Sequence, residues 1–371
     1  MKQVKITYKE PCIFLFIFLI IFGYLGAEMG LVNLLNTIMN TAYALLMDTV
    51  FYIMAISVIA GALGSVLIEF GVIALIHRML SRFMEPVFNL PGASIMGVMT
   101  TFLSDNPAIL TLAKDPSFVS YFKPFQLPAL TNLGTGFGMG LIIMTYMMSL
   151  NEAFIVPAII GVIGATIGSI ISVRIMLSFT KKMKWEEDTI TFETNHENTR
   201  MIRDGSVANR LMTALLDGGQ QGVQLGFDII PGVLIICTFV MLLTNSAPVS
   251  GYTGAAYEGV GLLPQLGQYL EFILTPLFGF SSSASISVPI TALGSAGAAM
   301  SLVPTLHASP NDIAVFTAMC MCFSGYLSTH VAMMSVLGFP HLTGKSIISH
   351  TVGGICAGIS AHFIYLLISL I

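Results

Sequence analysis

Apolar residues in this chain form long runs, whereas a soluble helix would alternate apolar and polar positions every three or four residues. Seven runs approach or exceed the length of about 20 residues that an α-helix needs to cross a bilayer. The predicted spans are residues 12–27, 48–76, 125–149, 153–179, 218–245, 311–338 and 347–371. This pattern predicts an all-α polytopic membrane protein.

Two further apolar stretches, residues 87–112 and 277–306, are interrupted by polar residues near their middle. Basic residues mark the cytoplasmic side of a membrane protein, and Lys114 and Lys123 follow the first stretch. A single crossing there would put these lysines and the basic cluster at 181–184 outside. We therefore predict that residues 87–112 form a re-entrant hairpin entered from the cytoplasm. By the same reasoning, residues 277–306 form a second hairpin entered from outside.

The two hairpins read as copies of one segment, offset by 190 residues. At this offset Pro86 aligns with Pro276, and Thr101 aligns with Thr291. Upstream, an offset of 169 aligns residues 46–48 with residues 215–217. The simplest explanation is an insertion at residues 244–261. Because the two copies are predicted to face opposite sides of the bilayer, the chain is expected to contain an inverted-topology repeat with broken transmembrane helices.

We expect four parts along the chain. They are an N-terminal transmembrane anchor (1–40), a first inverted repeat (41–180) with the cytoplasmic-side hairpin, a cytoplasmic linker loop (181–210), and a second inverted repeat (211–371) with the outside hairpin. Interfacial amphipathic helices are predicted at residues 76–85 and 262–275. The expected location is a bacterial-type plasma membrane, with the N-terminus cytoplasmic and the C-terminus outside. Residues 1–27 also resemble a signal peptide, but we prefer an uncleaved first span.

Composition supports the membrane assignment and excludes several functions. The chain is 55% hydrophobic and 9% charged, whereas soluble domains carry about 25% charged residues. It has no basic patch for nucleic acid, no phosphate-binding loop for ATP and no recognisable catalytic motif. Five cysteines lie in apolar segments and support neither disulfides nor a metal site. We expect no enzyme activity and no cofactor, apart from a bound Na⁺.

The polar breaks at the hairpin tips are the first candidates for chemistry. The first tip reads Ser104, Asp105, Asn106, Pro107, and the second reads Gly294, Ser295, Ala296, Gly297. A carboxylate in a bilayer is costly unless it is paired, hydrated or ion-bound. We predict ion coupling at Ser104 and Asp105, and substrate contacts at Asn106 and Ser295. The alternative for Asp105 or Ser104 is an N-cap of the following helix, and both roles are compatible.

Polar residues in three spans are the second group of candidates. Two spans after the hairpins combine glycine with hydroxyl and amide residues at mid-length, which suits an unwound segment that binds substrate. Close helix packing through small residues is the alternative. The predicted substrate contacts there are Thr131, Asn132, Thr135, Ser324, Thr329 and His330, although His330 could equally titrate or bond a neighbouring carbonyl. In the span at 218–245, Gln224 and Asp228 share one helical face and are predicted to contact substrate and ion, respectively.

Residues 215–219 and 225–231, together with residues 85–92 and their copy at 275–280, give the chain a family resemblance. Over about residues 40–370 it resembles the Gate (nucleoside recognition) domain superfamily. That superfamily includes concentrative nucleoside transporters, gate regions of ferrous-iron transporters and spore-maturation membrane proteins. In the nucleoside transporters, hairpin tips and broken helices contact substrate and sodium, which by position implicates residues 104–106, 131, 132, 135, 295, 324 and 329. The resemblance also implies a homo-oligomer, a trimer or a dimer.

Two functional hypotheses follow. The first is a secondary active transporter of a small polar or zwitterionic solute, nucleoside-like or amino-acid-like, coupled to Na⁺ or H⁺. Residues 211–371 contain one basic side chain besides histidine, Lys345, so a multiply anionic substrate is disfavoured. The second is a non-transporting gate or assembly protein of the spore-maturation type that acts with a partner, since a fold does not fix a function.

Overall fold

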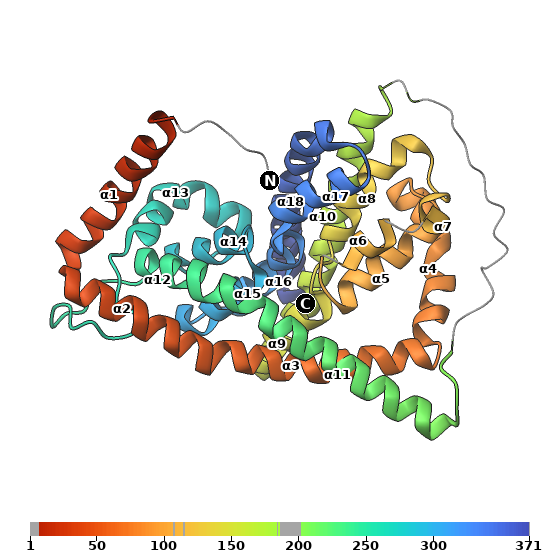
Figure 1. The fold of residues 1–371 in the computed structure, drawn as a ribbon, viewed down its shortest axis with the longest axis horizontal. Coiled ribbons are helices and arrows are strands. Elements are labelled where there is room, and N and C mark those ends of the chain that lie inside the picture. The colour runs from red at the N-terminus through yellow and green to blue at the C-terminus, as the bar shows by residue number, and fades with distance from the viewer. Residues whose placement is uncertain (1–6, 107, 114–115, 184, 186–201, 371) are drawn as a thin grey trace.

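The structure is a computed structural model that describes residues 7–106, 108–113, 116–183, 185 and 202–370 (Figure 1). Over these residues it is helical and contains no strand. The first half contains α1 (Lys9–Met29), α2 (Leu31–Ala44), α3 (Phe51–Glu69), α4 (Val72–Phe88), α5 (Ile95–Leu103), α6 (Ala108–Ala113), α7 (Pro116–Val119), α8 (Leu127–Thr135), α9 (Gly140–Leu150) and α10 (Ile155–Thr180). The second half contains α11 (Val207–Pro231), α12 (Thr238–Thr244), α13 (Leu262–Phe278), α14 (Ser287–Ala292), α15 (Ala296–Leu302), α16 (Pro310–Phe323), α17 (Tyr326–Val336) and α18 (Thr343–Ser369).

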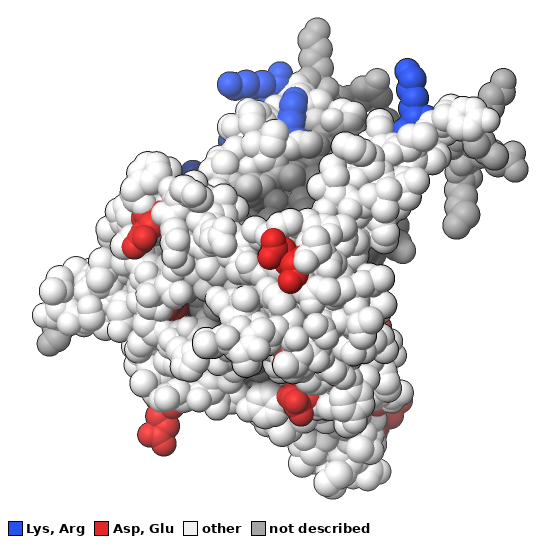
Figure 2. Space-filling view, turned by 90° about the vertical axis from the view of Figure 1, so that its left-hand side faces the viewer, with Lys and Arg blue, Asp and Glu red and all other residues white. Residues whose placement is uncertain are grey.

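Among the described residues, seven helical segments are long and apolar enough to cross a membrane, as predicted. They are Lys9–Met29, Leu31–Glu69, Pro124–Leu150, Glu152–Thr180, Val207–Thr244, Pro310–Val336 and Pro340–Ser369. Two bent pairs, Arg78–Phe88 with Gly92–Leu103 and Leu262–Phe278 with Ser283–Ala292, turn by 109° and 79°. These bends mark the hairpin entries, and at the tips the short helices α5 and α14 pack against α6 and α15. On the face that Figure 2 shows, Lys and Arg gather toward the top, and Asp and Glu lie below them. The fold class is thus confirmed as an all-α membrane protein with two hairpins and two spans that break.

Several predicted boundaries were wrong. The second span does not run over 48–76: its helix starts at Leu31, runs past the expected boundary at 40/41, and ends at Glu69. Gly71 adopts a left-handed conformation, with φ of 79°, which ends that helix and lets α4 begin at Val72 rather than at 76. In the second half, α11 begins at Val207, inside the predicted linker 181–210. Most of that linker, residues 184 and 186–201, lies outside the described residues.

The long helices α3 and α11 cross side by side along one edge of the molecule (Figure 1). Glycines make the crossing close: a Cβ on Gly61 would lie 2.4 Å from the carbonyl oxygen of Gly218. A Cβ on Gly222 would lie 2.4 Å from the carbonyl carbon of Ser57. Small residues let two backbones approach in this way, which is typical of membrane helix pairs. We call α3 and α11 the frame.

Helices α10, α16 and α18 form the centre of the molecule, with α4–α7 on one side and α12–α15 on the other (Figure 1). Glycines again bring the backbones together, because a Cβ on Gly168 would lie 2.4 Å from the carbonyl oxygen of Gly353. A Cβ on Gly161 would lie 2.4 Å from the Cβ of Thr317. We call this centre, with α8, α9 and α17, the core.

Polar side chains of the spans hold the entry of each hairpin. Arg174 on α10 donates hydrogen bonds to the carbonyls of Pro86 and Val87, at 2.6 and 2.7 Å. The amide of Gln126, before α8, donates to the carbonyl of Asn89 at 2.9 Å. In the second half, the amide of Asn311 on α16 donates to the carbonyls of residues 278 and 279. Residues 89 and 279 are 190 apart, so both halves bond the same position of the repeat, as an inverted repeat requires.

Candidate functional site

A pocket of about 200 Å³ lies where both hairpin tips, both broken helices and α11 meet. The first tip contributes Asp105, and the second contributes residues 294–297. The broken spans contribute Met139 and Ser324, Gly325, Ser328 and Thr329, while α11 and the segment after it contribute Asp228, Ile229 and Gly232. The pocket therefore lies at the interface of the frame and the core.

The first hairpin tip is attached to the second broken helix by hydrogen bonds. Asn106 Nδ2 donates to the carbonyl of Ser324 at 2.6 Å. One Asp105 oxygen, Oδ1, accepts from the amide of Asn106 at 2.7 Å and from the hydroxyl of Ser324 at 3.5 Å. Since that carboxylate lines the pocket, the predicted interpretation of Asp105 as a group facing a cavity agrees with its place. Its side chain bonds the very next amide, so it also orders the turn.

The second hairpin tip meets the same break from the other side. The amide of Gly325 donates to the carbonyl of Ala292 at 3.0 Å. The hydroxyl of Ser295 accepts from the amide of Ala298 at 3.2 Å, as an N-cap of α15. A Cβ on Gly325, whose φ is 65°, would lie 3.1 Å from the carbonyl oxygen of Gly294. The break at Ser324–Gly325 thus bonds both tips and fixes their separation.

The pocket wall that α11 contributes is acidic. Asp228 lines the pocket, and its Oδ1 accepts from Gln224 Nε2 at 2.8 Å. Gln224 and Asp228 therefore share one face, as the sequence predicted, with Gln224 behind Asp228. No Lys, Arg or His is among the described residues that line this pocket. Its polar surface consists of carboxylates, hydroxyls and backbone groups, which suit a solute or ion with hydrogen-bond donors or a positive charge.

Four of the predicted site residues lie away from the pocket lining, in the core. Thr131, Asn132, Thr135 and His330 are all fully buried. Three of them belong to one hydrogen-bond cluster, the histidine network, which consists of Asn132, Thr135, Ser172, His330, Ser346, Ser349 and His350. The Thr131 hydroxyl has no hydrogen-bond partner among the residues that the structure describes. Ser104 ends α5 just before Asp105 and is absent from the lining.

Sequence reasoning missed the α18 part of this network. Ser346, Ser349 and His350 fall at helical spacings on α18, and all three are fully buried. A polar stripe at i, i+3 and i+4 in an apolar span is a signal that was available. This stripe is a weak signal by itself, because a serine on a membrane helix usually bonds its own backbone, as Ser349 does to the carbonyl of Lys345 at 2.7 Å.

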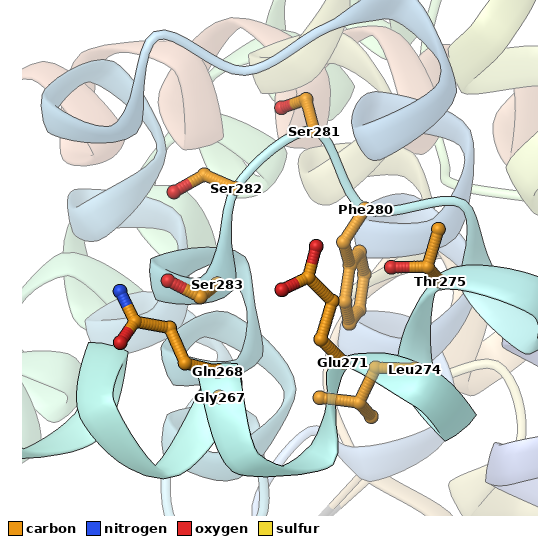
Figure 3. Close-up of a pocket in the computed structure, with 9 residues that line it drawn as sticks. All are labelled: Gly267, Gln268, Glu271, Leu274, Thr275, Phe280, Ser281, Ser282 and Ser283. Carbon is orange, nitrogen blue, oxygen red and sulfur yellow. The ribbon is translucent and has the colours of Figure 1, made fainter.

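A second pocket, of about 160 Å³, lies at the entry of the second hairpin between α13 and residues 280–283 (Figure 3). Figure 3 shows the carboxylate of Glu271 between Phe280 and Ser283, with Gln268 beside it. Gln268 and Glu271 are exposed, and Phe280 and Ser283 are half-buried. The hydroxyl of Ser281 is already bonded to Asp312. None of the predicted site residues lies here.

Comparison with known proteins finds similarity in fold to one transporter. No family model matches the chain, and no curated protein matches it. Two solved structures of the concentrative nucleoside transporter CNTnw are similar. The inward-facing, substrate-bound structure has a TM-score of 0.52 and 14% identity, covering 83% of this chain and 74% of the other.

A doubly substituted form of CNTnw in an outward-facing state has a TM-score of 0.51 and 14% identity, with 84% of this chain and 73% of the other covered. At this identity the likeness concerns the fold. The chain is therefore a multi-pass membrane protein with a fold similar to that of CNTnw, and the Gate superfamily assignment rests on the sequence resemblance alone.

Proposed function

We propose that this protein is a secondary active transporter that carries a small polar solute across a membrane by alternating access. The observation that carries the proposal is the pocket between frame and core, closed by two hairpin tips and a helix break. Irregular backbone at membrane depth is tolerated where it lines a cavity. The similarity to CNTnw in inward- and outward-facing states supports a pocket that opens to alternate sides.

The pocket lining indicates the class of substrate. It offers two carboxylates, four hydroxyl side chains and several backbone groups, but no basic side chain among the described residues. An anion there would meet like charge in a setting of low dielectric. A nucleoside-like or amino-acid-like solute would instead donate hydroxyl or amino hydrogens to these acceptors. We therefore expect neutral or zwitterionic solutes and exclude multiply charged anions.

We further propose coupling to Na⁺ or H⁺, with Asp105 as the principal ligand and Asp228 as a second acidic group at the same pocket. Asp105 has one oxygen engaged by the tip itself. The Oδ1 atom of the neighbouring Asn106 is fully buried and has no hydrogen-bond partner among the described residues. A buried oxygen without a partner, on the residue next to an acidic one, is a group that a desolvated cation could satisfy.

The test measures thermal stability of the purified protein with uridine, L-serine and uridine monophosphate, each with NaCl, KCl or choline chloride at equal ionic strength. We expect uridine or serine to raise the melting temperature with one cation and the doubly charged monophosphate to have no effect. Liposome uptake of the stabilising solute should then fall roughly a hundredfold in Asp105→Asn, because charged hydrogen bonds contribute about 1.5–3 kcal/mol. Asp105→Glu is the matched control. Unchanged uptake and ion dependence in Asp105→Asn would disprove the coupling role.

The second candidate is a non-transporting assembly protein that works with a partner. Such a role needs no polar cavity at the interface of frame and core. The acidic, hydroxyl-lined pocket between the tips therefore favours transport. A flat thermal response to every solute and cation, from protein shown to be folded, would favour the assembly role instead.

A further inference from the structure

The histidine network joins the inner parts of both broken helices to α10 and α18. Asn132 and Thr135 come from α8, Ser172 from α10, His330 from α17, and Ser346, Ser349 and His350 from α18. All seven residues are fully buried. The imidazole centroids of His330 and His350 are 4.8 Å apart, and the Tyr326 ring contacts both, at 5.3 and 5.0 Å. Transport as proposed above assigns no role to this cluster.

The hydrogen bonds determine which nitrogen of His350 carries the proton. His350 Nε2 lies 2.6 Å from the carbonyl of Cys322, which can only accept, so Nε2 is the donor. His350 Nδ1 then accepts from the hydroxyl of Ser172 at 3.0 Å. Ser172 in turn accepts from Asn132 Nδ2 at 2.9 Å. His350 is therefore satisfied as a neutral imidazole.

His330 takes the opposite tautomer. Ser346 donates its hydroxyl to Asn132 Oδ1 at 2.7 Å, so it accepts from His330 Nδ1 at 2.9 Å. His330 Nε2 is then free to accept from the hydroxyl of Thr135 at 2.8 Å. With both rings neutral, every donor and acceptor of the two histidines has a partner. This is the condition under which a buried polar network stabilises a structure.

A second proton would place a net charge inside the network. On His350 it would direct Nδ1–H at Ser172, whose hydroxyl bonds no other acceptor among the described residues. On His330 it would direct Nε2–H at Thr135, whose hydroxyl can turn to the carbonyl of Thr131 at 2.9 Å. Neither imidazolium would meet a carboxylate, and an uncompensated buried charge is strongly unfavourable.

The surrounding elements supply no counter-charge among their described residues. Helices α5, α6 and α8 carry no titratable side chain. Arg174 on α10 bonds the hairpin entry, Asp312 on α16 bonds Ser309, and Lys345 on α18 is exposed. Asp105, between α5 and α6, bonds Asn106 and Ser324, and Glu85 on α4 and Glu152 before α10 are exposed. The remaining titratable groups on the packed elements are His77, Arg78 and Arg82 of α4, Tyr146 of α9, Cys320 and Cys322 of α16, Tyr326 of α17, His341 after α17, Cys356, His362 and Tyr365 of α18, and Tyr269 and Glu271 of α13.

Helix α17 connects this network to the pocket. Its first turn carries Ser328 and Thr329, which line the pocket, and His330 follows directly. We propose that His330 is a positioning residue of the pocket. Together with His350 and Thr135 it holds the first turn of α17 through uncharged hydrogen bonds, and the pocket keeps its shape only while both imidazoles are neutral. The protonation state of the network can be tested whether or not the protein transports a solute, whereas its effect on uptake rests on the proposed function.

The first test needs no substrate. We would record ¹⁵N spectra of protein in liposomes that is labelled at histidine, serine and threonine, and assign the signals with His330→Gln, His350→Gln, Ser328→Ala and Thr329→Ala. The expected result at pH 7.5 is a neutral His330 protonated on Nδ1 and a neutral His350 protonated on Nε2. On acidification, the amide signals of Ser328 and Thr329 should shift at the pH where imidazolium appears. Imidazolium at pH 7.5, or unmoved Ser328 and Thr329 amides, would overturn the proposal.

The second test measures uridine uptake against pH. We expect His330→Phe to raise KM about tenfold with Vmax nearly unchanged, the equivalent of about 1.4 kcal/mol. His330→Gln keeps one donor and one acceptor without titrating. His330→Gln should therefore have a KM close to that of the parent, and its uptake should continue to a lower pH. His341→Gln, which changes an exposed histidine, serves as the control. If uptake by His330→Gln fell at the same acidic pH as uptake by the parent, the proposal would be contradicted. If the spectra were as expected but the protein took up no uridine, the role of His330 would be supported and the proposed transport would not.

Discussion

The two hairpin tips occupy matching positions in the repeat but differ in chemistry. The first tip presents Asp105 and Asn106, which bond across to the second broken helix. The second presents Ser295 and Ala296, where the serine caps its own short helix. Both tips meet the single break at Ser324–Gly325. The two tips therefore meet the same break through different bonds, and the charge that can act on a ligand is concentrated in one of them.

The largest difference between the tips should appear when a methyl group is added beside each. A Cβ on Gly138 would lie 2.0 Å from Asn106 Oδ1 and 2.9 Å from the Cβ of Ser324. Since Asn106 is held by its bond to Ser324, Gly138→Ala should cost roughly 3 kcal/mol of unfolding free energy, as overpacking does. On the other tip, a Cβ on Gly297 would meet only the side chain of Ile229, at 3.2 Å.

Gly297→Ala is therefore the matched control, with an expected cost below about 1 kcal/mol. Unfolding in mixed detergent micelles measures both variants. Equal costs for the two alanines would show that the first tip is no more tightly held than the second.

A smaller difference should separate the tip side chains themselves. Asn106→Ala removes the 2.6 Å bond to the carbonyl of Ser324 inside the core and should cost about 2 kcal/mol, because it leaves a buried carbonyl unpaired. Ser295→Ala removes an N-cap and should cost about 1 kcal/mol. If Ser295→Ala proved the more damaging in the same unfolding assay, the second tip would carry the greater share of tip stability.

The smallest effect concerns the segment at 244–261, predicted as the insertion that distinguishes the second half. Glu258 in it accepts from the amides of Thr253 and Gly254, and Thr37 on α2 donates to it at 3.3 Å. Burial works to raise the pKa of Glu258. Hydrogen bonds from Thr253 and from the backbone amides of residues 253–255 outweigh that effect and hold the pKa below its usual 4.5.

A lowered pKa means that the contribution of Glu258 to stability is present above pH 4.5 and is lost as pH falls through the folded-state value. We expect Glu258→Gln to lower the melting temperature by roughly 3 °C at pH 7 and to lose less than the parent between pH 5 and 3. If the melting temperatures of the parent and of Glu258→Gln fell by the same amount between pH 5 and pH 3, this role of Glu258 would be contradicted.

The sequence predicted the parts of the fold that depend on length and charge. Seven spans and two hairpins followed from apolar runs and from lysines such as Lys114 and Lys123. The helix from Leu31 to Glu69 was misjudged, because its first part is apolar enough to belong either to the preceding span or to the following one. The helix ends where Gly71 adopts a left-handed conformation, and the conformation of a glycine within an apolar run cannot be predicted from the sequence.

The candidate site was predicted in part for a similar reason. Asp105, Asp228, Ser295, Ser324 and Thr329 line the pocket together, since breaks in apolar segments must face something polar. Asn132, Thr135 and His330 carry the same residue types at the same depth, yet they bond one another through Ser172 and His350. Composition at mid-span cannot distinguish a wall of a cavity from an internal network, because that difference depends on the partner helix.

At Gly61, Gly218 and Gly222 the crossing of α3 and α11 brings main chain against main chain. The closeness of the two helices there does not depend on the side chains that they present to lipid. Those side chains can therefore be substituted during evolution, as a membrane changes in thickness or composition, without moving the two helices relative to each other. Distant homologues should thus be detectable by small residues at these three places, even where the rest of both helices has become unrecognisable.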